Sequence, residues 1–216
     1  MTLSTSDDST LDDHIATPRP THRSVLPAFV LAACIILLAF VAIEVAALFG
    51  TKVTKVLKDP ATVYKFPIFA GFVTHIGVFI LIATSAIAGF VSAIKVPHAK
   101  RLAAVSILSL MLAFDDMYLF HERVGPWLLG TSEEVVMLVY AIFALSIAFQ
   151  FRKNLFAREQ LPLLMAGVAL MISMVIDMDG GSGGSIVLVE DLSKLAGYSL
   201  WSGFWLTFAR ADLRLL

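Results

Sequence analysis

Six apolar segments dominate this chain, and their length constrains its fold more than any other feature. They cover residues 25–49, 67–94, 101–122, 134–152, 161–177 and 186–210. An α-helix needs about 20 apolar residues to cross the roughly 30 Å of hydrocarbon in a bilayer. The segments are too long and too continuous to be the strands of a membrane barrel. The sequence therefore predicts an all-α fold, a polytopic integral membrane helical bundle with six transmembrane helices.

The overall composition supports the same class and narrows the choice of partners. Hydrophobic residues make up 58% of the 216 residues and charged residues only 15%, whereas about a quarter of a soluble domain is charged. The lipid bilayer is therefore the main partner, and the pattern is typical of a multi-pass protein of a bacterial inner membrane. The formal net charge is -1, and no basic groove indicates nucleic-acid binding.

The chain divides into a short tail and one membrane domain. Residues 1–24 are rich in Ser, Thr, Asp and Pro, which predicts a disordered cytoplasmic tail. Residues 25–216 form the predicted six-helix transmembrane domain. Because Lys and Arg gather in cytoplasmic loops, we expect an N-in/C-in topology, which places ten of them inside and five outside. The inner ten are Arg19, Arg23, Lys95, Lys100, Arg101, Arg152, Lys153, Arg158, Arg210 and Arg214, and the outer five are Lys52, Lys55, Lys58, Lys65 and Arg123.

Ionisable side chains within the predicted spans crowd toward one end of the bundle, which this topology places in the outer half of the bilayer. The crowded residues are Glu44, His75, Asp115, Asp116, His121, Glu122, Asp177, Asp179, Glu190, Asp191 and Lys194. A charge in hydrocarbon is costly and usually marks a site, a proton relay or a transport pathway. We therefore expect the function of the chain to reside at this end.

The end of the third span carries the densest group of these residues. Asp115 and Glu122 are predicted to lie on one face of this helix, two turns apart, because seven residues complete nearly two turns. The same geometry directs His121 about 120° away from Asp115 and places Asp116 on one face with Arg123. One helix then offers two carboxylates to a shared cavity.

Carboxylate and imidazole groups are also the ligands that zinc, iron and manganese take in proteins. His75, in the second span, is expected at a depth similar to that of Asp115 on the neighbouring antiparallel helix. The sequence thus predicts a divalent metal held by His75, Asp115, His121 and Glu122. The competing interpretation is a set of hydrogen bonds between helices near the headgroups, and a haem bound by His75 and His121 is a further alternative.

Two other spans supply charged residues. Glu44 is a solitary carboxyl group in the first span, flanked by small residues that allow close helix packing. Glu190 and Lys194 stand four residues apart in the sixth span, in the order that favours an ion pair. We expect Glu44, Glu190 and Lys194 to act with Asp115 and Glu122 as the catalytic acid–base groups, with Asp177 at the mouth of the site.

Two local resemblances were considered, and neither extends over the chain. Glu190 followed by Lys194 and Gly197 resembles the last helix of microbial rhodopsins, but that family has seven spans. His75 with Asp115 and Asp116 is similar in kind to the zinc ligands of the ceramidase-like superfamily, but the closing His-x-x-x-His motif of that superfamily is missing. The sequence also lacks a phosphate-binding glycine loop and a His-Glu-x-x-His motif.

Three functions are consistent with these features. The first is a membrane enzyme, with or without a metal, that acts on a lipid or isoprenoid substrate at headgroup depth. The second is a proton- or cation-coupled transporter or channel, since proton relays use buried Asp, Glu and His. The third is a non-catalytic subunit of a membrane complex. The enzyme is the preferred hypothesis, because the polar groups are confined to one half of the bilayer.

Overall fold

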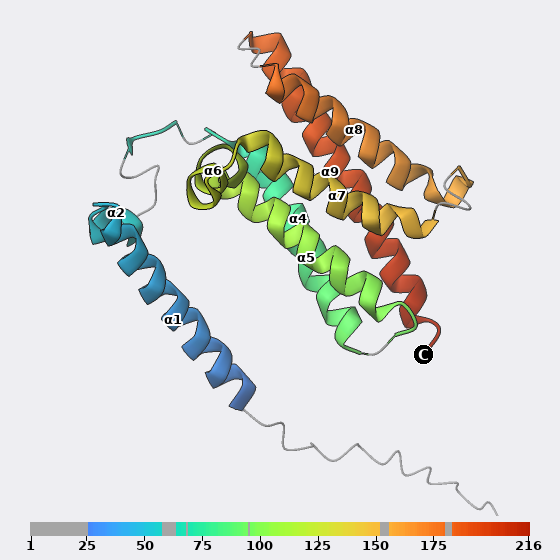
Figure 1. Ribbon diagram of the computed structural model, residues 1–216. Helices are drawn as coiled ribbons and strands as arrows, with labels where there is room; N and C mark the ends of the chain where they lie inside the picture. The colour runs from blue at the N-terminus through green and yellow to red at the C-terminus, as the bar shows by residue number, and fades with distance from the viewer. Residues whose placement is uncertain (1–25, 58–63, 68, 95, 152–155, 180–182) are drawn as a thin grey trace, which may run out of the picture. The chain divides into compact units, whose positions relative to one another are not determined.

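The computed structural model describes residues 26–57, 64–67, 69–94, 96–151, 156–179 and 183–216 (Figure 1). The predicted cytoplasmic tail, residues 1–24, lies outside the described residues. The chain separates into two compact units, with the boundary between Ile68 and Phe69. Each unit is described by itself below.

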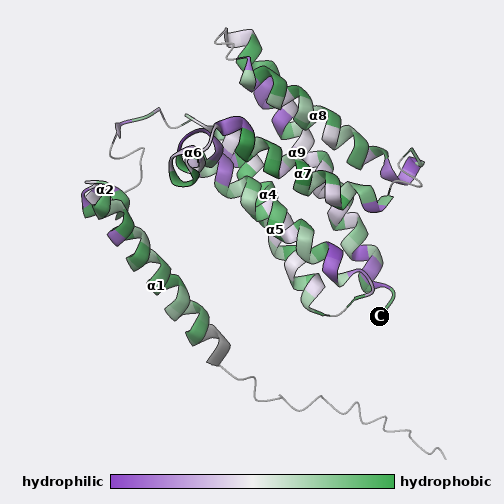
Figure 2. Ribbon diagram, viewed as in Figure 1, coloured by the Kyte–Doolittle hydropathy of each residue, from purple (hydrophilic) through white to green (hydrophobic). Residues whose placement is uncertain are grey.

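Within the described residues, the first unit contains one long apolar helix and one short helix after it. Helix α1 spans Leu26–Leu48 and helix α2 spans Val53–Leu57. Figure 2 shows α1 as hydrophobic along almost its whole length, and large apolar side chains such as Phe29, Leu37 and Phe40 are exposed on it. Such a helix suits a lipid environment, because lipid solvates apolar side chains on every face.

The second unit is a bundle of helices, and the described residues contain no strand. Its elements are α4 (Phe72–Ala93), α5 (Ala99–Tyr118), the π-helix η1 (Phe120–Val124), α6 (Gly125–Leu129), α7 (Glu133–Ala148), the 3₁₀ turns η2 (Phe149–Phe151) and η3 (Arg158–Gln160), α8 (Leu161–Met178) and α9 (Gly184–Leu213). The closest packing is between α4 and α5, between α8 and α9, and between α4 and α9. Helix α9 thus lies at the centre of the unit.

The helices account for most of the predicted spans. Four described helical segments are long and apolar enough to cross a membrane: Phe29–Leu48, Phe72–Ala93, Glu133–Phe151 and Arg158–Met178. A fifth is obtained if the bent pair Ala99–Tyr118 and Phe120–Leu129 counts as one span. The described residues confirm the all-helical fold, and the length and composition of these segments are those of a multi-pass membrane protein. The 30-residue helix α9 is long enough to cross a membrane, but its sequence is not apolar enough to be counted with these segments.

The sequence of α9 explains why it differs from the other long helices. Its buried residues are Gly197, Tyr198, Trp201, Ser202, Trp205, Ala209 and Asp212, a mixture of small, aromatic and polar groups rather than an aliphatic stripe. A helix surrounded by other helices does not need the all-round apolar surface of a lipid-facing helix. Trp201 uses this position to donate its indole N–H to the Ser109 hydroxyl on α5, at 3.0 Å.

The centre of the bundle depends on close contact between α8 and α9. At Gly197, an added Cβ would lie 2.6 Å from both Cγ and Cδ2 of Leu170 and 3.3 Å from the Ala166 carbonyl oxygen. No side chain fits there unless the Leu170 side chain moves. Small residues allow this kind of approach between membrane helices, and Gly197 therefore fixes the spacing of the pair.

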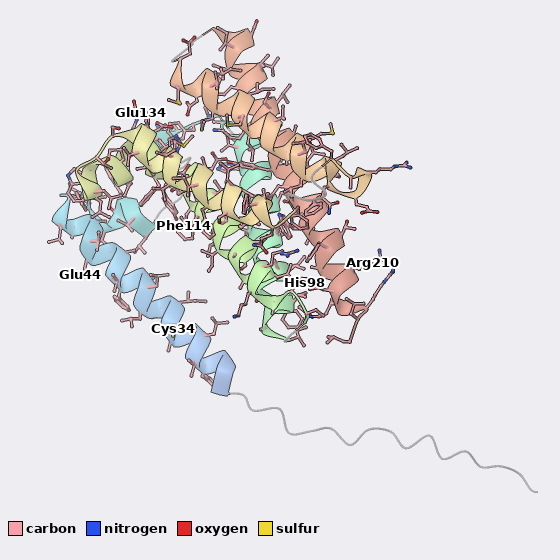
Figure 3. All side chains as sticks on the ribbon, turned by 45° about the vertical axis from the view of Figure 1, so that its right-hand side comes forward. Cys34, Glu44, His98, Phe114, Glu134 and Arg210 are labelled. Carbon is pink, nitrogen blue, oxygen red and sulfur yellow. The ribbon has the colours of Figure 1, made fainter. Side chains whose placement is uncertain are left out.

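One end of the bundle is closed by a cluster that links the α4–α5 turn to the C-terminal end of α9. His98 donates its backbone N–H to Asp212 Oδ2 at 3.1 Å, and its ring Nδ1 lies 2.8 Å from Asp212 Oδ1. The Arg101 guanidinium lies over the rings of Phe151 and Phe208. Figure 3 shows His98 and Arg210 at this end and Glu134 at the opposite end.

The predicted continuous helix over residues 101–122 is wrong in one respect, because it breaks near its end. Helix α5 ends at Tyr118, and Leu119 adopts the left-handed conformation, with φ 52° and ψ 47°. The chain then turns by 76° into the segment Phe120–Leu129. A non-glycine residue in this conformation costs about 1–3 kcal/mol, so surrounding contacts must stabilise the bend.

We predict that Gly197→Ala lowers the stability of the bundle by about 1–3 kcal/mol, because the new methyl group overpacks the α8–α9 contact. Gly203→Ala in the same helix is the matched control, since its Cβ meets nothing within 4 Å. That variant should be neutral or stabilising by up to about 1 kcal/mol. Thermal unfolding in detergent, followed by circular dichroism, measures both. Equal stability of the two variants would contradict the inferred packing.

Candidate functional site

A cavity of about 210 Å³ lies among α5, η1, α7, α8 and α9 of the second unit. The lining residues are Leu108, Leu112, Asp115, Asp116, His121, Met137, Tyr140, Ala141, Ala144, Leu145, Gly167, Leu170, Met171, Ser173, Met174, Asp177, Lys194 and Tyr198. Most of this wall is apolar, and its ionisable residues come from the C-terminal ends of α5 and α8, from η1 and from the N-terminal part of α9. The cavity therefore combines an apolar chamber with a charged end.

The bend after α5 brings Asp115 and His121 into direct contact. Asp115 Oδ2 lies 2.6 Å from His121 Nδ1, and Asp115 Oδ1 accepts the His121 backbone N–H at 2.7 Å. The Tyr140 hydroxyl of α7 donates to the same Oδ1 at 3.2 Å. Both side chains of the pair are almost fully buried. The prediction that His121 points away from Asp115 is wrong, because it assumed that the helix continues through Leu119.

These bonds define the chemical state of the imidazole. Asp115 accepts the His121 backbone N–H and the Tyr140 hydroxyl, which is the pattern of an ionised carboxylate. The hydrogen between Asp115 and His121 is therefore assigned to Nδ1, and in a neutral ring Nε2 is then an acceptor. His121 Nε2 is buried and has no hydrogen-bond partner in the described part of the chain. The nearest charged atoms are Asp177 Oδ2 at 3.5 Å and Glu122 Oε1 at 4.0 Å.

A second charged pair crosses from α5 to α9. Lys194 Nζ lies 3.5 Å from Asp116 Oδ1 and 4.0 Å from Glu190 Oε1. The expected Glu190–Lys194 pair is thus present, but Asp116 is the nearer partner of the ammonium group. The predicted pairing of Asp116 with Arg123 on one helical face fails, because the bend at Leu119 lies between the two residues. By distance and angle, Asp116 Oδ2 has no hydrogen-bond partner among the described residues.

Asp116, Lys194 and Tyr198 also line a much smaller hollow on the α4 side of α9, next to Gly77 and Asp191. Gly77 allows this arrangement, because a Cβ there would lie 3.0 Å from the Tyr198 ring. The Asp116–Lys194 pair therefore forms a partition between the two hollows. The pair lies between the large cavity on one side and the small hollow beside α4 on the other.

The apolar part of the cavity follows the seam between α7 and α8. Met137, Ala141 and Leu145 contribute one wall, and Gly167 and Met171 contribute the other. Among the described residues these two helices hardly pack against each other, whereas α8 packs tightly on α9. A seam of this kind, with apolar side chains on both sides, suits an aliphatic chain.

The structure places the predicted site residues in three groups. Asp115, His121, Asp177 and Lys194 line the cavity together. Glu122 and Glu190 lie beside it, each 4.0 Å from a cavity-lining group. His75 is exposed on α4 and does not line the cavity, and Glu44 is exposed on α1 in the first unit.

The predicted metal set His75, Asp115, His121 and Glu122 is not assembled. No group of three or more His, Cys, Asp or Glu side chains suited to a metal ion occurs in the described part of the chain. The physical reason is the bend at Leu119, which turns Asp115 toward His121 and removes Glu122 from the Asp115 face. His75 is exposed one helix away.

Sequence reasoning missed Tyr140, Tyr198 and Ser173, all of which are buried and line the cavity. A weak signal exists for each tyrosine. Tyr198 continues the four-residue spacing of Glu190 and Lys194, so it lies on the same face of α9. Tyr140 is a polar-tipped side chain within an apolar helix, where its hydroxyl needs a partner. Ser173 gives no signal that distinguishes it from other serines in the spans.

The arrangement is suited to moving a proton next to an apolar ligand. Asp115 orients the His121 ring and is placed to stabilise its protonated form, which is the arrangement found in Asp–His pairs that act as general bases. Tyr140 steadies Asp115 from α7, and Asp177 lies near the atom that would gain the proton. The Asp116–Lys194 pair supplies a fixed dipole within the same wall.

The comparisons with known proteins identify a family and nothing more specific. No match was found among curated proteins or among solved structures. One family model matches residues 28–208, a range that includes every residue that lines the cavity. Because this match extends over most of the chain, the protein belongs to the family described as a domain of unknown function (DUF8692).

Proposed function

We propose that this protein is an integral membrane enzyme that performs acid–base chemistry on a lipid-like substrate. The observation that carries the proposal is the His121 Nε2, which has no hydrogen-bond partner among the described residues and lies at the charged end of a largely apolar cavity, while Asp115 holds the other ring nitrogen. A positioned imidazole with a carboxylate partner contributes about 10²–10⁴ to a reaction rate as a general base. The proposed role of His121 is to remove a proton from a bound hydroxyl, amine or water.

The shape and lining of the cavity support a lipid-like substrate. Its long walls consist of Met, Leu, Ala and Gly side chains of α7 and α8, and its charged groups are confined to one end. An amphiphile fits such a site with its polar group near His121 and its chain along the α7–α8 seam. Entry from the bilayer needs little disruption of packing, because the two helices hardly contact each other in the described residues.

We further propose that α9 is the sixth span and that the termini are inside. Helix α9 runs antiparallel to α8 and parallel to α4, because the starts of α4 and α9 line the same small hollow and their ends meet at His98 and Asp212. It is long enough to cross, since 30 residues extend about 45 Å as a helix. Lys100, Arg101, Arg158, Arg210 and Arg214 lie at the end closed by His98 and Asp212. The positive-inside rule assigns that end to the cytoplasm and the cavity to the outer half of the bilayer.

A proton- or cation-coupled transporter is the second candidate, and the buried acids and His121 favour it. A transport path must continue beyond the cavity toward the opposite end. There, Phe204, Trp205 and Phe208 pack ring against ring with Phe151. Trp201 packs on Trp205 and donates its indole N–H to the Ser109 hydroxyl. This aromatic packing favours a closed cavity over a through-path. A non-catalytic subunit would retain the charged pairs without needing the free Nε2.

The decisive experiment for the catalytic base is His121→Gln. We expect about 10²–10⁴-fold slower turnover, because the variant keeps a polar side chain but loses the imidazole base. Purified full-length protein is reconstituted in vesicles made from the host's total lipid extract, and lipid species are followed over time by mass spectrometry. His98→Gln is the matched control, since His98 also pairs with an aspartate but lies at the closed end. Vesicles whose lipids change equally with wild type and His121→Gln would refute the enzyme.

A separate prediction concerns the substrate chamber. Gly167 lines the cavity, and a Cβ there would meet nothing within 4 Å. Gly167→Leu should therefore fill the chamber without disturbing Asp115 or His121, and raise KM at least tenfold with a smaller effect on kcat. Gly203→Leu, at another open glycine on α9, should leave both constants unchanged. A Gly167→Leu enzyme with wild-type KM would show that substrate binds elsewhere.

The topology is tested with single cysteines in a Cys34→Ser background. A membrane-impermeant maleimide should label Thr131→Cys, in the turn between α6 and α7, in intact cells. It should label Leu215→Cys, next to the end of α9, only after the cells are permeabilised. Labelling of both positions in intact cells would mean that α9 does not cross the membrane. Protection of Thr131→Cys would place the cavity in the inner half.

A further inference from the structure

The polar end of the cavity has an imbalance between hydrogen-bond donors and acceptors. The buried side-chain atoms without a hydrogen-bond partner in the described residues are Asp116 Oδ2, His121 Nε2, Gln160 Oε1, Ser202 Oγ and Trp205 Nε1. Asp116 and His121 are the two members of this set that line the cavity. Both side chains are more than nine-tenths buried, with 6% of each exposed. A buried polar atom without a partner is costly, so a ligand that satisfies both atoms gains from this deficit.

Both unpartnered atoms accept hydrogen bonds. A carboxylate oxygen is only an acceptor, and His121 Nε2 is an acceptor when Nδ1 holds its hydrogen toward Asp115. A third acceptor faces the same space, because Asp177 Oδ2 lies 3.5 Å from His121 Nε2. The site therefore requires a ligand group that donates several hydrogen bonds at once. Hydroxyl groups donate one, whereas a primary ammonium group donates three.

The charges of the cavity favour the same kind of group. Its ionisable lining residues are Asp115, Asp116, Asp177, His121 and Lys194. The Lys194 ammonium is already paired with Asp116 and Glu190, and Glu122 adds a carboxylate at the rim. Carboxylates thus outnumber cations even when His121 is protonated. An anionic headgroup would be repelled at this short range, whereas a cation is attracted.

We propose that the cavity selects an amphiphile with a primary ammonium group, which binds between Asp116, Asp177 and His121 Nε2 while its apolar chain occupies the α7–α8 seam. This inference rests on the proposed function, because it names the substrate class of the same cavity. It also gives His121 a specific role. The imidazole accepts a hydrogen bond from the ammonium group, and is positioned to take one of its protons.

The test is a binding measurement, so that its outcome is independent of turnover. Full-length protein in detergent is titrated with dodecylamine, dodecanol or dodecanoate, and native mass spectrometry gives the fraction of protein that carries the probe. A fourth arm uses a single-chain ethanolamine phospholipid, in which the ammonium group follows a phosphate. Tighter binding of this phospholipid than of dodecylamine would identify a membrane lipid headgroup as the source of the amine, and the reverse would identify a free long-chain amine.

We expect dodecylamine to bind at least tenfold more tightly than dodecanol or dodecanoate. Asp116→Asn and Asp177→Asn should each weaken amine binding about tenfold, the usual effect of removing one hydrogen bond to a charged group. Asp177 is partly exposed, so its variant remains informative if Asp116→Asn impairs folding. Asp212→Asn, at the closed end, is the matched control and should bind dodecylamine like the wild type.

The proposal is overturned if dodecanoate binds as tightly as dodecylamine, if the three probes bind equally, or if Asp212→Asn weakens amine binding as much as the cavity variants do. Failure of the enzyme hypothesis looks different. A protein that binds dodecylamine selectively but converts no lipid is an amine-binding protein without this catalytic activity. A protein that converts lipids without amine preference keeps the proposed function and loses only this substrate class.

Discussion

The paired hydrogen bonds between Asp115 and His121 are the interaction on which the cavity depends. Leu119 holds a strained backbone conformation between the two residues, and Asp115 offsets that strain by accepting both the backbone N–H and the ring nitrogen of His121. Without the bend, α5 would continue straight beyond the end of the bundle that holds the charged residues. With it, the imidazole turns back over the cavity, and Tyr140 of α7 joins the same carboxylate.

The sequence predicts the helices well because lipid imposes a simple requirement on them. Apolar runs such as residues 134–152 and 161–177 correspond closely to Glu133–Phe151 and Arg158–Met178, since any helix exposed to hydrocarbon must be apolar over the full span. The sequence also predicts that the charged residues gather at one end of the bundle. Asp115, His121, Asp177 and Lys194 do share one cavity, as their common depth in the sequence predicts.

What the sequence does not provide is the geometry within that end. A helical wheel pairs Asp115 with Glu122 and separates it from His121, and both conclusions reverse at Leu119. No residue near Leu119 indicates a helix break, because leucine is an ordinary helix former and the nearest glycine is Gly125. The bend is stabilised by tertiary partners rather than by local propensity, so it is absent from any reading of spacing alone. The exposure of His75 likewise depends on how α4 is rotated about its own axis, and the spacing of apolar residues does not predict that rotation.

The unequal packing of the seams has a mechanical consequence. Helices α4, α5, α8 and α9 form a continuous block through their mutual contacts, and Gly197 locks one of these contacts at close range. Helix α7 packs against α5, η1 and α6, and Tyr140 adds its hydrogen bond to Asp115. If the proposed amphiphile occupies the cavity, the α7–α8 seam is the place that opens at the lowest cost, because little packing is lost there. Tyr140 would then couple any tilt of α7 to the carboxylate that holds the His121 ring.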